Sequence, residues 1–181
     1  MTPAPLPAMG KVQMSEHILT RSGNNSADIS GDTPMRDALR QMDWAATSAG
    51  DIEQWPDPLK YATRLMFQSP APMAVLIGRE GLLAYNDAMR DLFGAYYEGS
   101  LGRPIEEVFP DVAHICREGI DRCFAGMGGR FRDEPVRVCL NGEWSTAWLH
   151  VACTPIADAN GHVSGVLLVI SETTERVVAL R

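Results

Sequence analysis

Several features are missing from this chain, and each absence excludes a class of protein. No run of about 18 apolar residues occurs, so we expect no membrane-spanning helix. Basic residues are few: 16 stand against 23 acidic ones, for a formal net charge of -7. Nucleic acids and anionic membranes both attract a basic surface, so we expect neither as a general partner.

Cysteine is scarce as well. The four cysteines are Cys116, Cys123, Cys139 and Cys153, and no two of them form a CxxC pair. We therefore expect neither a metal site nor a thioredoxin-type redox pair, and we expect free thiols in a reducing cytoplasm. Cys116 and Cys123 lie seven residues apart and so share a helix face. Metal or redox sensing stays open for this pair, although small buried core cysteines are commoner.

The common catalytic motifs are absent too. The sequence has no phosphate-binding glycine loop, no GxSxG nucleophile turn and no HExxH pair. The glycine-rich residues 126–129 follow a predicted helix and act as its stop signal. A histidine phospho-acceptor helix and an ATP-binding lobe are also missing. We expect that the chain is not an enzyme and that any kinase activity resides in a domain outside it.

The N-terminal third divides into a leader and a helical segment. Residues 1–33 are rich in Pro, Ser, Gly, Asn and Thr, and we expect a disordered leader because such a segment cannot bury enough apolar area. Residues 34–69 predict N-terminal helices that flank the domain. Thr33 and Pro34 suit a helix start, and apolar residues continue at helical spacing to Ala46.

A second N-terminal helix is predicted over residues 57–68 and ends before Pro70. Its apolar residues recur at helical spacing and predict a buried stripe. That stripe consists of Leu59, Ala62, Leu65 and Met66.

The strands of the domain are predicted within residues 70–176. Two short strands come first, over residues 73–77 and 82–85. Three longer strands follow later, over residues 130–140, 144–154 and 163–170, with Asn141-Gly142 as a hairpin turn. Pro135 and its neighbours predict a local irregularity in the first of these three.

Short helices are predicted between the two groups of strands. Asn86 begins one of them, Pro104 begins another turn of helix, and Asp111 caps a longer helix that ends near Gly126. Together these elements predict an α+β fold, a five-stranded antiparallel sheet with helices on one face, preceded by the N-terminal helices.

A series of short motifs accompanies this order of elements over residues 44–176. They read Trp44-Ala45-Ala46-Thr47, Gln54-Trp55-Pro56, Ser69-Pro70-Ala71-Pro72-Met73, Tyr85-Asn86-Asp87-Ala88, Leu101-Gly102-Arg103-Pro104, Glu107-Val108-Phe109-Pro110, Thr154-Pro155-Ile156-Ala157-Asp158 and Ser171-Glu172-Thr173-Thr174-Glu175-Arg176. This series resembles the PAS sensor domain at the N-terminus of bacterial sensor histidine kinases. The resemblance covers residues 44–176, and residues 70–176 would be the PAS-like domain itself.

The resemblance implies a sensory module of a two-component system, which relays a conformational change through its C-terminal linker. Residues 177–181 would begin an output helix, with Thr173, Thr174 and Arg176 as signal-relay residues. We expect a homodimer and a downstream kinase or effector domain. Two alternatives remain: a ligand-free dimerisation or protein-interaction module, and a haem- or small-molecule-binding sensor.

A ligand pocket would lie between the helices and the sheet. Its candidate lining residues, which are equally candidates for the core, are Met89, Phe93, Ile105, Val108, Phe109, Ile120, Phe124 and Leu168. The cofactor is unknown, and we expect none. Flavin-binding PAS domains have a reactive cysteine where this chain has Ile105, which disfavours a covalent flavin adduct.

Haem is a less favoured possibility. Haem-binding PAS domains use a histidine on the long helix as axial ligand, and His114 is the candidate here. His114 is about one residue out of register with that pattern, which corresponds to about 100° of helical rotation. A histidine at the surface or half-buried near a helix start is the alternative interpretation.

Overall fold

The structure is a computed structural model and describes residues 33–94, 97 and 99–180. The predicted disordered leader, residues 1–33, lies outside the described residues except for Thr33. Within the described ranges, no helix is both long and apolar enough to cross a bilayer.

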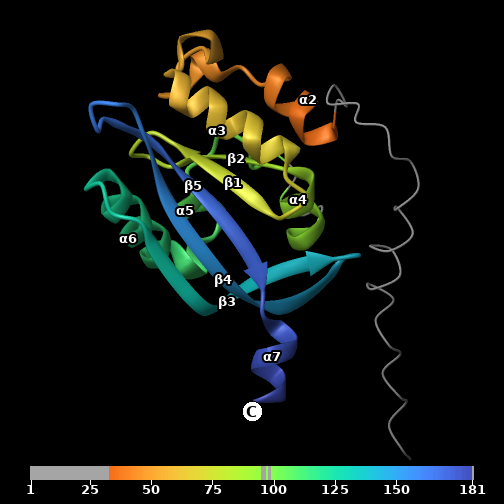
Figure 1. Cartoon of the computed structure of the whole chain (residues 1–181). Helices are drawn as coiled ribbons and strands as arrows, with labels where there is room; N and C mark the ends of the chain where they lie inside the picture. The colour runs from red at the N-terminus through yellow and green to blue at the C-terminus, as the bar shows by residue number, and fades with distance from the viewer. Residues whose placement is uncertain (1–32, 95–96, 98, 181) are drawn as a thin grey trace, which may run out of the picture. The chain divides into compact units, whose positions relative to one another are not determined.

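A five-stranded antiparallel sheet is the centre of the fold (Figure 1). Its strands are β1 (Met73–Ile77), β2 (Leu82–Tyr85), β3 (Gly129–Leu140), β4 (Glu143–Ala157) and β5 (Val163–Glu172). Their order across the sheet is β2-β1-β5-β4-β3, and every neighbouring pair is antiparallel. This confirms the predicted α+β fold and places the last strand, β5, in the middle of the sheet.

Helices pack on both faces of this sheet (Figure 1). One face carries α4 (Asp87–Phe93), α5 (Ile105–Val108) and α6 (Ala113–Phe124), with the short 3-10 helix η4 (Pro110–Val112) before α6. These are the helices that the sequence predicted for the sheet.

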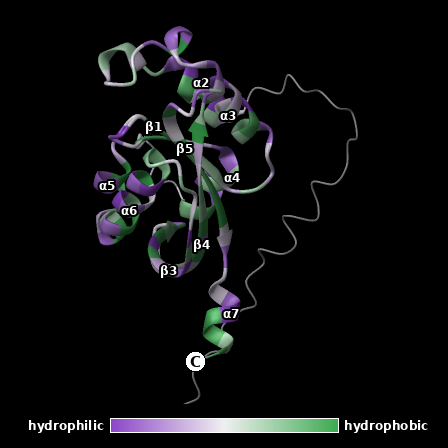
Figure 2. Ribbon diagram, turned by 60° about the vertical axis from the view of Figure 1, so that its left-hand side comes forward, coloured by the Kyte–Doolittle hydropathy of each residue, from purple (hydrophilic) through white to green (hydrophobic). Residues whose placement is uncertain are grey.

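The N-terminal helices cover part of the opposite face. They are α2 (Pro34–Gln41) and α3 (Asp57–Gln68), connected through the 3-10 helices η1 (Trp44–Ala46) and η2 (Ile52–Gln54). Alternation along β1 explains how one strand serves both faces: Met73, Val75 and Ile77 join the α2–α3 cluster, while Ala74 and Leu76 join the α4–α6 cluster. Figure 2 shows hydrophobic residues along the central strands.

Two helix boundaries differ from the prediction. Thr33 caps α2 as expected, its hydroxyl accepting a hydrogen bond from the Arg36 N–H (3.4 Å), but the helix ends at Gln41, well before Ala46. Asp43 then caps η1, its carboxylate accepting from the Ala46 N–H (3.3 Å). Asp111 lies within η4 and does not cap α6, whose start has no side-chain cap.

Helix α3 has the predicted bounds, but one residue of its predicted stripe is wrong. Leu59 and Met66 are buried, whereas Leu65 is 56% exposed. Thr63 takes the buried position between them, and its hydroxyl donates to the Leu59 carbonyl (2.8 Å). Because the hydroxyl is satisfied within the helix, burying Thr63 leaves no polar group without a partner.

Two tryptophans fill the cluster beneath α2 and α3. The rings of Trp44 and Trp55 meet edge to face with centroids 5.2 Å apart, and both are nearly fully buried. The Trp44 indole donates to the Leu39 carbonyl (2.8 Å), and the Trp55 indole lies 3.1 Å from the carbonyls of Ala49 and Gly50. Each ring therefore buries a large apolar area while its N–H keeps a partner.

Asn86 connects the two sides of the sheet. Its side-chain amide donates to the carbonyls of Met66 (3.0 Å), Ser69 (3.3 Å) and Ala71 (2.8 Å). Its side-chain carbonyl accepts from the backbone N–H groups of Met73 (3.1 Å) and Met89 (3.0 Å). One buried side chain thus joins the end of α3, the start of β1 and the first turn of α4.

The predicted hairpin turn and the predicted irregularity are both present. Asn141 and Gly142 have φ angles of 52° and 81°, as a tight two-residue turn requires. Strand β3 bulges between Phe131 and Glu134, and Asp133 there has a φ of 55°. Asp tolerates this left-handed conformation better than most residues other than glycine.

Candidate ligand cavity and output helix

A small apolar cavity lies between the sheet and helices α4–α6. Its volume is about 70 Å³. Side chains from all three helices and from strands β1, β3, β4 and β5 line it. A space of this size holds a few waters, or a molecule of a few heavy atoms, since one water needs roughly 10–15 Å³ of such volume.

Most of the predicted lining residues reach this cavity. They are Met89, Phe93, Ile105, Phe109, Ile120 and Leu168. The two others, Val108 and Phe124, are half-buried and pack against the surrounding core without lining the cavity. Phe124 instead lies under the Arg79 guanidinium, 4.7 Å from its ring centroid.

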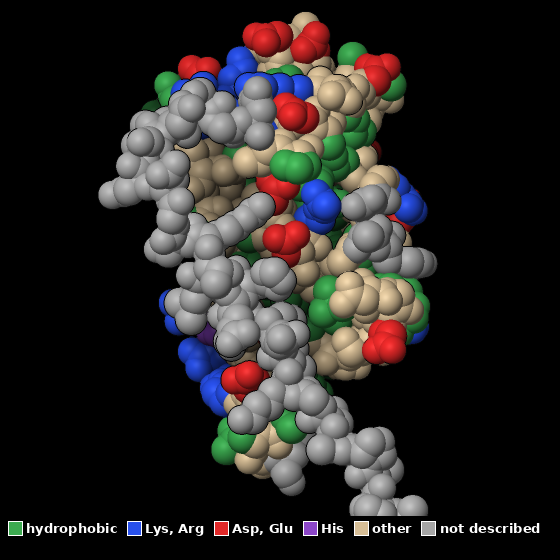
Figure 3. Space-filling view, turned by 90° about the vertical axis from the view of Figure 1, so that its right-hand side faces the viewer, with side chains coloured by type: hydrophobic (Ala, Val, Ile, Leu, Met, Phe, Trp, Pro, Cys, Tyr) green, Lys and Arg blue, Asp and Glu red, His purple; other side chains and the backbone are tan. Residues whose placement is uncertain are grey.

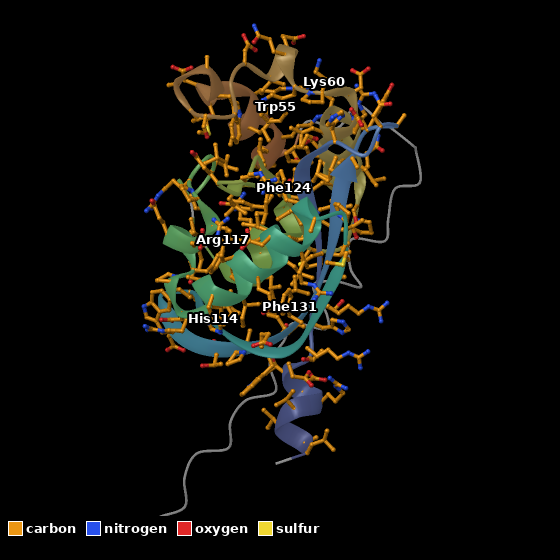
Figure 4. All side chains as sticks on the ribbon, turned by 90° about the vertical axis from the view of Figure 1, so that its left-hand side faces the viewer. Trp55, Lys60, His114, Arg117, Phe124 and Phe131 are labelled. Atoms are coloured by element: carbon orange, nitrogen blue, oxygen red, sulfur yellow. The ribbon has the colours of Figure 1, made fainter. Side chains whose placement is uncertain are left out.

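His114 does not line the cavity. It is exposed near the N-terminal end of α6, whereas the next two residues, Ile115 and Cys116, take part in the lining. Figure 4 shows His114 and Arg117 on α6, and Phe131 on the strand beside this helix. Among the described residues that line the cavity there is no histidine, and His114 lies outside it.

The cavity is small compared with pockets that hold ligands of the size of flavin or haem. A pocket for a ligand of that size typically has several hundred cubic ångströms, against about 70 Å³ here. Ile105, at the position of the reactive cysteine of flavin-binding domains, is buried and lines the cavity. In the described residues, no cluster of three or more His, Cys, Asp or Glu side chains could hold a metal ion.

Residues that the sequence did not assign to a pocket make up the rest of the lining. Two of them are thiols, Cys116 on α6 and Cys153 on β4. Burial raises the pKa of Cys116 to about 11, with a further contribution from Glu106, and burial raises the pKa of Cys153 to about 12. Both thiols are therefore protonated near neutral pH, and they contribute apolar surface instead of nucleophiles.

Glu134 is the one charged residue of the lining, and its position follows from the bulge. Phe131 pairs with Val151, while Glu134 pairs with Leu149, so β3 has one more residue than β4 across this step. The extra residue reverses the alternation of the strand. Glu134 consequently faces the cavity together with Val136, whereas an unbroken alternation from Phe131 would have turned it away.

The outer side of α6 is held by an ion pair. Arg117 binds the carboxylate of Glu106 and donates to the Arg79 carbonyl (3.0 Å). The hydrogen bond from Arg117 holds the pKa of Glu106 below its ordinary value. This pair connects α5 to α6 on the side away from the sheet and so helps to fix the helices that close the cavity.

A second, more polar groove lies between α2 and α3. It measures about 280 Å³ and is bordered by basic side chains, among them Arg36, Arg40, Lys60 and Arg64. The Lys60 ammonium donates to the Glu53 carbonyl (2.6 Å). Several of its charged residues are exposed, in contrast to the apolar lining of the cavity on the other side of the sheet.

The C-terminal helix α7 (Thr174–Ala179) is tied to the sheet at its start. The Thr173 N–H donates to the Trp148 carbonyl (2.7 Å), and the Trp148 N–H donates to the Thr174 hydroxyl (3.0 Å). Two predicted relay residues are thus held by β4, the strand next to β5. The helix leaves the sheet directly from its central strand (Figure 1).

The third predicted relay residue, Arg176, binds the bulge of β3. Its guanidinium pairs with the Asp133 carboxylate (2.5 Å), which also accepts from the Thr173 hydroxyl (2.9 Å). These two contacts hold the pKa of Asp133 below its ordinary value, with the Thr173 hydroxyl as the larger cause. Sequence reasoning missed Asp133, because its partners lie some 40 positions away in the chain.

Comparisons with known proteins identify the fold. The family model described as "PAS fold" matches residues 66–178. The PAS domain of BvgS from Bordetella pertussis is 28% identical, with 70% of this chain and 93% of that chain covered and a TM-score of 0.51. Among curated proteins, no significant match was found.

Two further solved structures are similar to this chain at lower identity. A sensory box sensor histidine kinase from Vibrio cholerae is 17% identical, covering 64% of this chain and 90% of that chain, with a TM-score of 0.46. An RNA-binding light-oxygen-voltage receptor is 19% identical, covering 70% of this chain and 36% of that chain, with a TM-score of 0.49.

Proposed function

The chain belongs to the PAS-fold family, and we propose that it is the sensory input module of a bacterial two-component sensor kinase. In this proposal, the conformation on the α4–α6 side of the sheet sets the position of α7. A change in that position is then passed to a kinase or effector domain. The proposal is supported by the motifs of residues 44–176, which resemble those of kinase input domains, and by the anchoring of α7.

The anchoring of α7 is the observation that carries the proposal. Strand β5 is hydrogen-bonded to β1 along one edge and to β4 along the other, so a displacement of either strand would act on β5. Thr173 and Thr174 join the end of β5 to Trp148 of β4, and Asp133 of β3 binds Arg176. A shift of either neighbouring strand, β1 or β4, relative to β5 would therefore change the angle or the register of α7.

A homodimer is part of the proposal. Val178 is 63% exposed and Leu180 is 81% exposed, so the end of α7 presents apolar side chains to solvent. Hydrophobic side chains are visible near the C-terminal end in Figure 3. Pairing α7 with its copy in a second chain would bury them, as helices with an apolar stripe do in coiled coils.

The dimer is tested by multi-angle light scattering on the complete chain and on the double variant Val178→Asp/Leu180→Asp. We expect a dimer for the wild type and a monomer for the variant, because two carboxylates in each helix would repel across the pair. The variant Tyr61→Asp, on the exposed side of α3, is the matched control and should stay dimeric. A monomeric wild type would contradict the dimer.

The chain itself makes and breaks no bonds in this proposal, and the kinase chemistry belongs to another domain. The module would work in the cytoplasm, where its four free cysteines stay reduced.

A chimera tests the role as an input module. The complete chain is joined through α7 to a histidine kinase core that lacks its own sensor, with zero to seven alanines inserted after Ala179. We expect autophosphorylation to rise and fall with the insertion length, because each added residue turns the following helix by about 100°. A rate that is independent of insertion length, and equal to that of the core behind a flexible Gly-Ser linker, would contradict the proposal.

A further inference from the structure

A quarter of the basic side chains of this acidic chain border one groove. The chain has 16 Lys and Arg residues and a net charge of -7. Four of the basic residues line the groove between α2 and α3, Arg36 and Arg40 from α2 and Lys60 and Arg64 from α3. Figure 4 shows Lys60 and Trp55 in this part of the fold. On each helix the two cations are four positions apart, where like charges repel, so helix stability alone does not account for them.

Three of these cations have no carboxylate partner in the protein. Among the described residues, no carboxylate forms an ion pair with Arg36, Lys60 or Arg64. Lys60 donates to the backbone carbonyl of Glu53 (2.6 Å), and the Arg64 guanidinium lies 5.9 Å from the ring centroid of Tyr61. Both of these partners are uncharged. Arg36 is half-buried, so its positive charge is partly removed from water.

Two carboxylates near the groove reduce its positive charge without cancelling it. Asp37 pairs with Arg40 (3.9 Å), and both side chains are about half exposed. Glu53 is the acid within the lining, and it is exposed. With Arg40 paired, three cations stand against one carboxylate. The groove therefore keeps a surplus of positive charge that an anion can compensate.

The rest of the lining is apolar or already hydrogen-bonded. Leu39 and Trp55 are buried, and Ile52 and Phe67 are half-buried. The hydroxyl of Thr63 donates to a carbonyl of its own helix (2.8 Å). Cationic donors beside an apolar surface are complementary to an anion that carries an apolar group.

We propose that this groove binds a small organic anion with an apolar ring, such as an aromatic carboxylate. The carboxylate would pair with the guanidinium groups of Arg36 and Arg64, whose planar forks match its two oxygens, while the ring lies against the apolar lining. A groove of about 280 Å³ is near the lower end of ligand pockets, about 300 Å³, so the ligand is small. Because the two arginines come from different helices, the ligand joins α2 to α3.

Ligand class is tested with benzoate, benzyl alcohol, benzylamine and acetate on the complete chain at low ionic strength. NMR shifts of the Trp55 indole N–H and the Ile52 methyl groups report binding, at concentrations on the order of 10 mM, because ligands with few heavy atoms bind weakly. We expect benzoate to bind at least tenfold more tightly than benzyl alcohol or acetate, and benzylamine not to bind. Benzoate that fails to bind, or that binds no better than the alcohol or acetate, would overturn the proposal.

Two variants isolate the arginines, one from each helix. Arg36→Gln and Arg64→Gln should each weaken benzoate binding at least threefold and leave the binding of benzyl alcohol unaffected. Arg132→Gln, an equal charge change at an exposed position of β3 outside the groove, is the matched control and should leave benzoate binding unchanged. If Arg132→Gln weakens binding as much as the groove variants do, benzoate responds to general surface charge and the site is wrong.

The joining of the two helices has a separate readout. Saturating benzoate should slow amide hydrogen exchange of Leu39, in α2, at least threefold in the wild type and not in Arg36→Gln. Unchanged exchange in the wild type despite binding would overturn the pairing with α2. The site does not rest on the proposed function, so failure of the kinase chimera would count against the input-module role alone, and failure of the benzoate titration against this groove alone.

Discussion

The two sides of the sheet are built differently. Beneath α2 and α3, Trp44 and Trp55 fill the space, and each indole N–H is bonded to a backbone carbonyl. Beneath α4–α6 the side chains leave an almost wholly apolar cavity of about 70 Å³. Beneath the α2–α3 side two buried tryptophans fill the core, whereas the α4–α6 side encloses a small apolar cavity.

The two sides of the sheet also differ in how they connect to the C-terminal helix α7. The bulge that turns Glu134 toward the cavity also presents Asp133 to Arg176 of α7. The α2–α3 cluster contains residues of β1 and β2, Ile156 of β4 and the partly buried Leu167 of β5, and none of these is among the described residues that hydrogen-bond or ion-pair with α7. We therefore expect changes on the α4–α6 side to reach α7, and changes on the α2–α3 side to affect mainly global stability.

The largest effect is expected from removing a tryptophan beneath α2 and α3. Trp44→Ala should lower the free energy of unfolding by about 3–5 kcal/mol, since Trp44 is only 2% exposed and its loss leaves a cavity. Urea denaturation measures this loss. Trp144→Ala, at a tryptophan that is 43% exposed, is the control and should cost less than about 1.5 kcal/mol. Equal losses in the two variants would mean that Trp44 does not contribute to the core as its burial indicates.

A slightly smaller loss is expected at the junction between the two sides. Asn86→Ala should lower the free energy of unfolding by about 2–4 kcal/mol, because several buried backbone groups lose their partner at once. Asn160→Ala, at an exposed turn, should change it by less than about 0.5 kcal/mol. A loss below about 1 kcal/mol at Asn86 would show that water replaces its hydrogen bonds and that the junction contributes little.

The thiols report on the closure of the α4–α6 side. With a pKa of about 11, Cys116 has a thiolate fraction of about 10⁻⁴ at pH 7, roughly 100-fold below that of an ordinary thiol, and the fraction rises tenfold per pH unit until the pKa is reached. Alkylation of Cys116 by iodoacetamide, followed by mass spectrometry, should be slower by at least that factor than at a surface thiol introduced by Ser145→Cys. Similar rates at the two positions would indicate that the cavity is open to solvent.

The smallest and most local effect is expected at the contact between Asp133 and α7. Arg176→Ala should speed amide exchange at Val177 a fewfold without moving the global unfolding transition, because the pair lies at the surface. The control is Arg40→Ala, which removes the surface pair with Asp37 and should leave Val177 unchanged.

Acid should have the same effect as Arg176→Ala. Since the pKa of folded Asp133 lies below its ordinary value of 3.8, the contact stabilises α7 above that value. It is lost as the pH falls through the lowered pKa. NMR titration of the Asp133 carboxyl measures this, and a midpoint at or above 3.8 would contradict the contact.

Local sequence signals predicted the elements whose ends are marked by proline, glycine or asparagine residues. Pro56 and Pro70 bracket α3, and the φ angles of Asn141 and Gly142 fit the hairpin that these residues predicted. The strands β4 and β5 extend beyond their predicted ends, because register with neighbouring strands continues through residues such as Pro155 that carry little strand signal. Pairing with a distant strand is not visible in a local window.

The cavity was predicted less completely than the fold for a related reason. Apolar residues on the helices, such as Phe93 and Ile120, were found because their spacing assigns them to a buried face. Glu134 was not among the predicted lining residues, since alternation from Phe131 places it outward and only the bulge reverses this. The partner of Arg176 was also missed, because the contact with Asp133 depends on where two distant strands come together.

One measurement tests the central claim most directly, namely that the α4–α6 side and not the α2–α3 side communicates with α7. Amide exchange at Val177 is compared in Leu149→Ala and Leu59→Ala, which truncate equally buried leucines, one lining the cavity and one beneath α3. The account predicts several-fold faster exchange in Leu149→Ala and no change in Leu59→Ala, at matched global stability adjusted with urea. Equal acceleration in both variants, or none in Leu149→Ala, would contradict it.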